Sequence, residues 1–178
     1  MKIKNVLPIL LLSGLFLAQS CSKLVNIEKK INSISVIMTM DPTDSGEFSY
    51  QTVQTNALKA EIEKAGIKID EIKSIKAVVD SVVILNPDSP VVNFGYFNYV
   101  KVSVSGAGFE EKVITEQANF PDPNATTIYP SMKEDVDWVK LLNSSGDVTY
   151  KLNGSMRLKT PLKKDMKYCV SFYVSLAE

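Results

Sequence analysis

The side chains that carry most acid–base and metal chemistry are scarce in this sequence. Its 178 residues include no histidine, and its two cysteines are Cys21 and Cys169. Histidine titrates near neutral pH and is the commonest zinc ligand, so its absence excludes histidine-based triads, cysteine–histidine dyads and HExxH metalloprotease sites. The GxSxG motif, the phosphate-binding loop GxxxxGK[ST] and the dinucleotide motif GxGxxG are also missing. We therefore expect a protein that is not an enzyme and that needs no metal or cofactor.

Carboxylates are the catalytic groups that remain. Two carboxyl groups about 5 to 10 Å apart suffice to hydrolyse a glycosidic bond, but spacing along the sequence does not fix such a distance. The loops containing Asp41 to Glu47 and Asp122 to Asn124 have the oxygen-rich composition that suits calcium, without the EF-hand spacing. Side chains of this kind in turns usually accept backbone hydrogen bonds. A carboxylate-based glycan hydrolase remains the alternative function.

The residues before Cys21 indicate what that cysteine does. Lys2 and Lys4 precede an apolar run, VLPILLLSGLFL at 6–17, which ends in Ala18-Gln19-Ser20-Cys21. A helix of this length covers about 18 Å, well short of the roughly 30 Å hydrocarbon core, so the run is typical of a secretory signal. The stretch that ends in Cys21 resembles the lipobox of bacterial lipoproteins, in which an apolar residue and two small residues precede an obligatory cysteine.

This resemblance implies a lipid anchor. Type II signal peptidase would remove residues 1–20, and Cys21 would carry a thioether-linked diacylglycerol and an amide-linked acyl chain. Two or three chains hold a protein at a bilayer because each buried methylene contributes about 0.8 kcal/mol. In Gram-negative lipoproteins the next residue influences sorting, and Ser22 favours the outer membrane. We expect attachment to its periplasmic face, with surface display as one alternative and a plain secreted protein, cut after Ser20, as another.

Charge and composition restrict the partners of the mature chain. Twenty basic and twenty acidic residues cancel, and no run of like charge gives a footprint for nucleic acid. The apolar content of 45% and charged content of 22% are those of a globular protein. We expect a lipidated N-terminus and short tether over 21–32, then a single domain over 33–178.

Aromatic residues gather in the stretch NFGYFNYV, residues 93–100. Alternation from Phe94 places Phe94 and Tyr96 on the core side of a strand. The opposite, wet face then carries Phe97 and Tyr99, flanked by Asn93 and Asn98. Exposed rings of this kind suit sugar stacking or protein docking. The alternatives are that a helix or the tether covers the rings, or that a bulge near Gly95 resets the alternation and buries them.

The elements that would position these residues are mostly strands. Alternation of apolar and polar residues predicts strands within 33–40, 67–85, 94–105, 114–120, 148–159 and 167–176, with Leu158 on the core side and Asp80 as an unexpected charge. Thr55 or Asn56 can cap a helix that ends at Gly66, and Ser131 with Glu134 forms a capping box for a helix to residue 142.

These elements predict an antiparallel β-sandwich, Ig-like, of seven or eight strands with two short helices; the alternative is an α+β sheet packed by helices. We expect a membrane-anchored envelope lipoprotein that binds or assembles with an envelope protein or polysaccharide. A purely structural subunit of an envelope complex is a further alternative.

Overall fold

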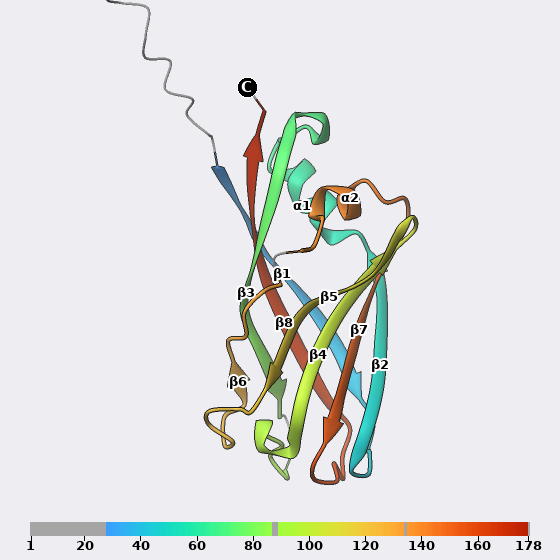
Figure 1. Ribbon diagram of the computed structural model, residues 1–178, viewed down its shortest axis with the longest axis vertical. Helices are drawn as coiled ribbons and strands as arrows, with labels where there is room; N and C mark the ends of the chain where they lie inside the picture. Colours follow the sequence, from blue (N-terminus) through green and yellow to red (C-terminus); the bar gives the residue numbers. More distant parts are fainter. Residues whose placement is uncertain (1–27, 87–88, 134, 178) are drawn as a thin grey trace, which may run out of the picture.

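Two four-stranded antiparallel sheets pack face to face in the computed structural model, which describes residues 28–86, 89–133 and 135–177 (Figure 1). The first sheet has the strand order β1-β8-β3-β6 and the second has the order β2-β7-β4-β5. The strands are β1 Glu28–Met40, β2 Gly46–Thr55, β3 Ile72–Leu85, β4 Phe97–Gly106, β5 Phe109–Ala118, β6 Thr127–Ile128, β7 Asp147–Met156 and β8 Lys164–Leu176. The predicted antiparallel β-sandwich is confirmed.

The connectivity is that of a jelly roll. The strands pair as β1 with β8, β2 with β7, β3 with β6 and β4 with β5, as in one long hairpin of eight strands folded back on itself. The β3–β8 and β4–β7 pairings then join these pairs into two sheets. The Ig-like detail of the prediction is wrong, because an Ig sandwich pairs its second strand with its fifth, whereas here β2 pairs with β7.

The core lies between the sheets and follows the predicted alternation in most strands. Val36, Met38 and Met40 of β1 are each at most 2% exposed. β1 begins at Glu28, inside the predicted tether, and Ile31 is already 2% exposed. Leu158 is wrong as a core residue, because β7 ends at Met156 and the chain beyond it turns into solvent, which leaves Leu158 50% exposed.

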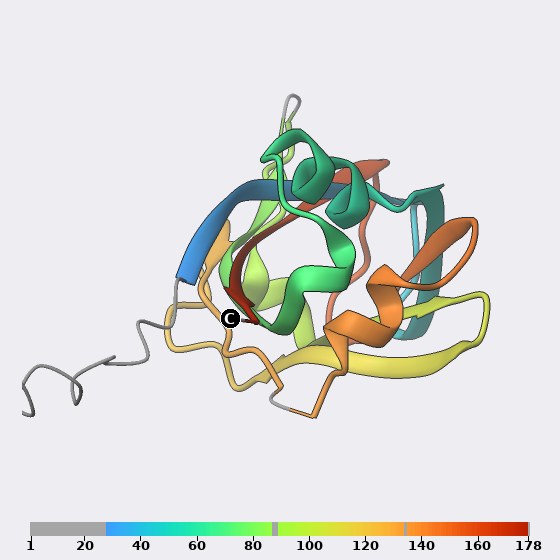
Figure 2. The same ribbon diagram turned by 90° about the horizontal axis from the view of Figure 1, so that it is seen from above.

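The first helix forms as predicted. Helix α1 spans Ala57–Lys64, and the Asn56 side chain caps it by accepting the Lys59 N–H at 3.2 Å. The Asn56 amide also donates to the Leu141 carbonyl at 3.2 Å, which ties α1 to the second helix. Both helices lie at the end of the sandwich where β1 begins and β8 ends (Figures 1 and 2). Within the described residues, no helix combines the length and the apolar character needed to cross a bilayer.

The second helix is shorter than predicted. Helix α2 spans only Trp138–Leu142, and Asp137 caps it by accepting the Lys140 N–H at 2.9 Å. The Ser131 capping box is wrong because this stretch pairs with β5 instead. The Lys133 N–H donates to the Ile114 carbonyl at 2.8 Å, and the Thr115 hydroxyl donates to the Ser131 carbonyl at 2.7 Å. The Ser131 carbonyl, which would have accepted the first bond of the predicted helix, is thus paired with β5 instead.

Two 3₁₀ turns complete the fold. One spans Ile69–Glu71, where the sequence predicted the start of a strand. The other spans Phe94–Tyr96 and occupies the first part of the predicted aromatic strand. The second turn shifts the point at which β4 begins, and this shift decides which aromatic rings face the core.

Candidate functional site

The predicted lipidation site, Cys21, lies outside the described residues, so the anchor stays a prediction. The other cysteine, Cys169, is a free thiol, half-buried in the middle of β8. Its neighbours across the first sheet are Ser35 and Ser81. No titratable partner lies beside it in this register, in keeping with a packing role for its side chain.

The predicted aromatic platform is wrong at Phe97, which is 0% exposed. The register between β4 and β7 shifts between Phe97 and Tyr99, and this bulge turns Phe97 into the core. Its ring lies 5.9 Å from the centroids of both Phe48 and Phe94, and Phe94 stacks on Phe120 at 5.1 Å. The rings therefore form an interior cluster instead of a docking surface.

A glycine in β7 makes room for this cluster. A Cβ atom at Gly154 would lie 2.4 Å from Cζ of Phe48 and 2.6 Å from the backbone oxygen of Tyr99. Both distances are shorter than any van der Waals contact, and the second involves a backbone atom that cannot rotate away. Gly154 is thus the position that lets the Phe48 ring cover the strand.

The other three platform residues have separate roles. Tyr99 is half-buried on the outer face of the second sheet, where its hydroxyl donates to Glu47 at 2.6 Å, and this hydrogen bond raises the pKa of Tyr99. Asn98 donates to the Ser155 hydroxyl at 3.1 Å. Asn93 accepts the Gly95 N–H at 3.1 Å and so caps the 3₁₀ turn. These contacts hold the local fold and leave one aromatic ring on the outer face.

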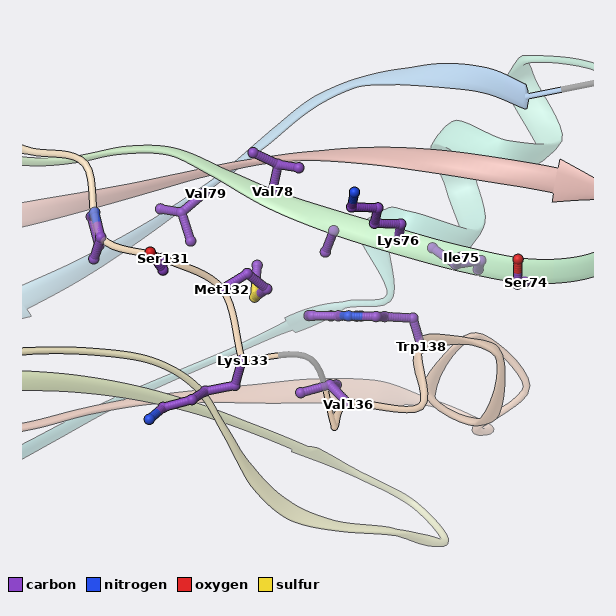
Figure 3. A pocket seen from close by; sticks show the side chains of 12 residues that line it. Ser74, Ile75, Lys76, Val78, Val79, Ser131, Met132, Lys133, Val136 and Trp138 are labelled. Carbon is purple, nitrogen blue, oxygen red and sulfur yellow. The ribbon is translucent and has the colours of Figure 1, made fainter.

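A groove in the structure does not correspond to any predicted site. It measures about 630 Å³ and lies between β3 and the crossing segment, residues 129–133 and 135–137, which runs from β6 toward β5 and α2. Residues 74–79 of β3 form one wall. Figure 3 shows Met132 and Trp138 lying between β3 and the crossing segment. Trp138 is 4% exposed and packs edge-on against Phe172, with ring centroids 5.1 Å apart.

The wall formed by β3 is also a sheet edge. β8 pairs with β3 along its length, whereas β6 pairs with it only at Val82 and Val83. β6 ends two residues before Pro130, which has no N–H to donate to a ladder. The chain then crosses to β5, where Met132 pairs with Thr115. Among the described residues, no strand therefore pairs with residues 74–79 on the groove side.

The groove combines an apolar floor with positive charge at its rim. Ala77 and Val79 are 6% and 7% exposed and point into the sandwich, and with Trp138 they give the groove an apolar floor. The charged residues among those that line it are Lys76 and Lys133. Within the described part of the chain, no three residues of the metal-ligating types come together. The arrangement suits an apolar ligand with negative charge at its edge.

The unexpected charge in β3 has a structural role. Asp80 lies at a bulge opposite β8 and accepts hydrogen bonds from the hydroxyls of Ser171, at 2.7 Å, and Ser33. Ser33 lies within a second bulge, in β1 between Ile31 and Ile34. The carboxylate thus joins the three strands β1, β8 and β3 on the outer face of the first sheet.

Comparison with protein-family models gives no match for this chain, and comparison with curated proteins gives no significant match. The groove is the site that the geometry supports. Its sequence signals were present as Pro130 directly after a short apolar stretch and Trp138 within the second helix. Neither signal indicated an open edge, because the length of β6 depends on pairing between segments far apart in the chain.

Proposed function

We propose that this protein is a lipid-anchored binding or assembly module of the bacterial cell envelope, and that it does not act as an enzyme. Two lines of reasoning support the proposal. The sequence ending in Cys21 resembles a lipobox, and the described domain offers an apolar groove beside an unpaired sheet edge. A protein held at a membrane can act by binding alone, without catalytic groups.

The position of the anchor relative to the domain follows from the fold. If acylated Cys21 begins the mature chain, six residues separate it from Glu28 at the start of β1, a span of at most about 25 Å. β1 begins beside the end of β8, since Glu28 pairs with Ser175. The domain would therefore sit with its helical end toward the bilayer, and the groove would open on the side of the sandwich.

The groove is the observation that carries the binding function. Its floor is apolar, and among the described residues that line it the charged ones are both lysines and none is a carboxylate. A glycan hydrolase needs two carboxyl groups across its cleft. The described lining residues therefore favour binding of a ligand over hydrolysis of a glycan.

Membrane fractionation of the Cys21→Ala variant tests the anchor. We expect the wild-type chain to stay with membranes after a carbonate wash and the variant to be released, because its acyl chains are lost. Cys169→Ala is the matched control and is expected to fractionate like the wild type. Unchanged membrane attachment of Cys21→Ala, or an unmodified Cys21 in the mass spectrum of the mature N-terminus, would contradict the proposal.

A further inference from the structure

The open edge of β3 specifies what kind of ligand the groove accepts. A strand in a sheet directs its backbone N–H and C=O groups alternately to its two sides. Along residues 74–79 the β8 side is paired, and the other side has no strand partner among the described residues. β6 occupies this edge of β3 only at Val82 and Val83. A strand added along residues 74–79 would therefore continue the line of β6 along the same edge.

We propose that an extended segment of a partner polypeptide adds to β3 as a further strand along residues 74–79. Its side chains are apolar at alternate positions, where they enter the groove, and it carries acidic residues where it passes Lys76 and Lys133. This inference deepens the proposed function by naming the class of partner. It depends on the protein being a binding module, although not on the lipid anchor.

Strand addition would use the unpaired edge of β3 and the apolar groove together. Main-chain hydrogen bonds along the edge supply affinity, and pockets for alternate side chains supply specificity. Side chains on one face of a strand recur about every 6.6 Å, since each residue advances about 3.3 Å. The groove runs along Ile75, Ala77 and Val79, whose side chains face the interior of the sandwich, and this is the same period of two.

The charges at the groove favour an acidic segment. Lys76 makes no ion pair within the described residues, whereas Lys133 pairs with Glu116 at 3.9 Å. The Lys76 ammonium group thus has the greater capacity for a further carboxylate. Complementary charges of this kind set the register and speed the association of a partner.

We expect the added strand to come from another polypeptide, because the described chain begins at the opposite edge of the first sheet. The chain enters the described domain at Glu28 in β1, and β1 is the strand at the opposite edge of the first sheet from β6. Both β8 and β3 therefore lie between β1 and the groove. A second copy of this chain is the other possible donor, and the experiment separates it from a different partner.

Selection of random twelve-residue peptides displayed on phage, against the full chain extracted in detergent, tests the proposal. We expect enriched peptides to alternate apolar and polar residues and to contain aspartate or glutamate. The most enriched peptide is then synthesised with N-methyl groups on its odd or on its even residues. One of these two forms should bind at least tenfold more weakly than the other, because only alternate amides face β3.

Charge reversal places the peptide on the groove. The double variant Lys76→Glu with Lys133→Glu should weaken binding of the acidic peptide at least tenfold and should favour a copy with lysine in place of its acidic residues. Lys101→Glu with Lys112→Glu, two lysines of the second sheet, is the matched control and should bind as the wild type does. Because Lys76, Lys112 and Lys133 are exposed and Lys101 is half-buried on an outer face, each variant is expected to fold.

Five results would overturn the inference, of which four concern the peptide. These four are a failure to enrich any peptide, enriched peptides with helical periodicity, equal tolerance of both N-methylated forms, and binding that the groove variant leaves unchanged. Self-association of the chain that the Lys76→Glu, Lys133→Glu variant abolishes would assign the edge to a second copy and would also overturn it. Any of these outcomes alongside Cys21-dependent membrane attachment would leave the proposed anchoring intact.

Discussion

The outer face around Tyr99 and the groove beside β3 differ in how fully their strands are paired. Around Tyr99, β4 is paired on both sides, by β7 and β5, and the aromatic side chains have turned into the core. Beside β3, the sheet edge is open over residues 74–79 and an indole lies under it. We therefore place the proposed binding site where backbone groups are left unpaired, and the density of aromatic residues in the sequence was a poor guide to it.

Truncating the two aromatic residues of the supposed platform should give the largest contrast. Phe97→Ala should lower the free energy of unfolding by about 3 to 5 kcal/mol, because it leaves a cavity in the ring cluster. Tyr99→Ala should cost about 1 kcal/mol or less, since the ring is at the surface and loses one exposed hydrogen bond to Glu47. Urea unfolding curves measure both. Equal, small effects would mean that Phe97 is not in the core.

Alkaline pH should lower the free energy of unfolding, and the buried tyrosines should contribute more to this loss than the tyrosine on the outer face. Burial raises the pKa of Tyr150 to about 12, and burial also raises the pKa of Tyr168. Below pH 10 these tyrosines are protonated in both states and their contribution is complete. Above pH 10 the unfolded chain loses protons that the folded chain retains, so stability falls by about 1.4 kcal/mol per pH unit for each tyrosine.

Urea unfolding at intervals from pH 8 to 11.5 measures this slope. Tyr150→Phe should reduce the slope above pH 10, and Tyr99→Phe, on the outer face, should change it less. A stability that is flat from pH 8 to 11.5 would contradict the burial of the two core tyrosines. If Tyr99→Phe reduced the slope as much as Tyr150→Phe does, the predicted difference between the buried and the outer tyrosine would be wrong.

A larger side chain in each region should distinguish close packing from open space. Gly154→Ala should cost about 1 to 3 kcal/mol, because its Cβ would meet the Phe48 ring and the Tyr99 backbone oxygen. Ala77→Val adds two methyl groups next to the groove and should change stability by about 0.5 kcal/mol or less, since the groove has room for them. Thermal melts of both variants test this, and a costly Ala77→Val would mean that the groove is closed.

Local patterns in the sequence predicted much of the fold. The alternation of Val36, Met38 and Met40 and the Asn56 cap act between neighbouring residues, so β1 and α1 could be predicted. The Ser131 helix was wrong because Thr115 and Ile114, distant in sequence, offer this stretch hydrogen bonds. A propensity signal gives way where tertiary pairing satisfies the same backbone groups.

The candidate site was less predictable for the same reason. The core position of Phe97 depends on a bulge against β7 and on the space that Gly154 provides across the sheet. The groove depends on β6 being only two residues long, which in turn reflects Pro130 and the pairing of Met132 with β5. Each of these contacts involves residues far apart in the chain, so the alternation within one segment could not predict it.

Residue-resolved amide hydrogen exchange of the full chain tests the open edge most directly. The account predicts that alternate amides within residues 74–79 exchange quickly, and that Val100, Val102 and their neighbours in the doubly paired β4 exchange slowly. Adding the selected acidic peptide should slow the fast amides of β3 and leave β4 unchanged. Uniformly slow exchange across residues 74–79 without peptide would show that the edge is already occupied, and would contradict the account.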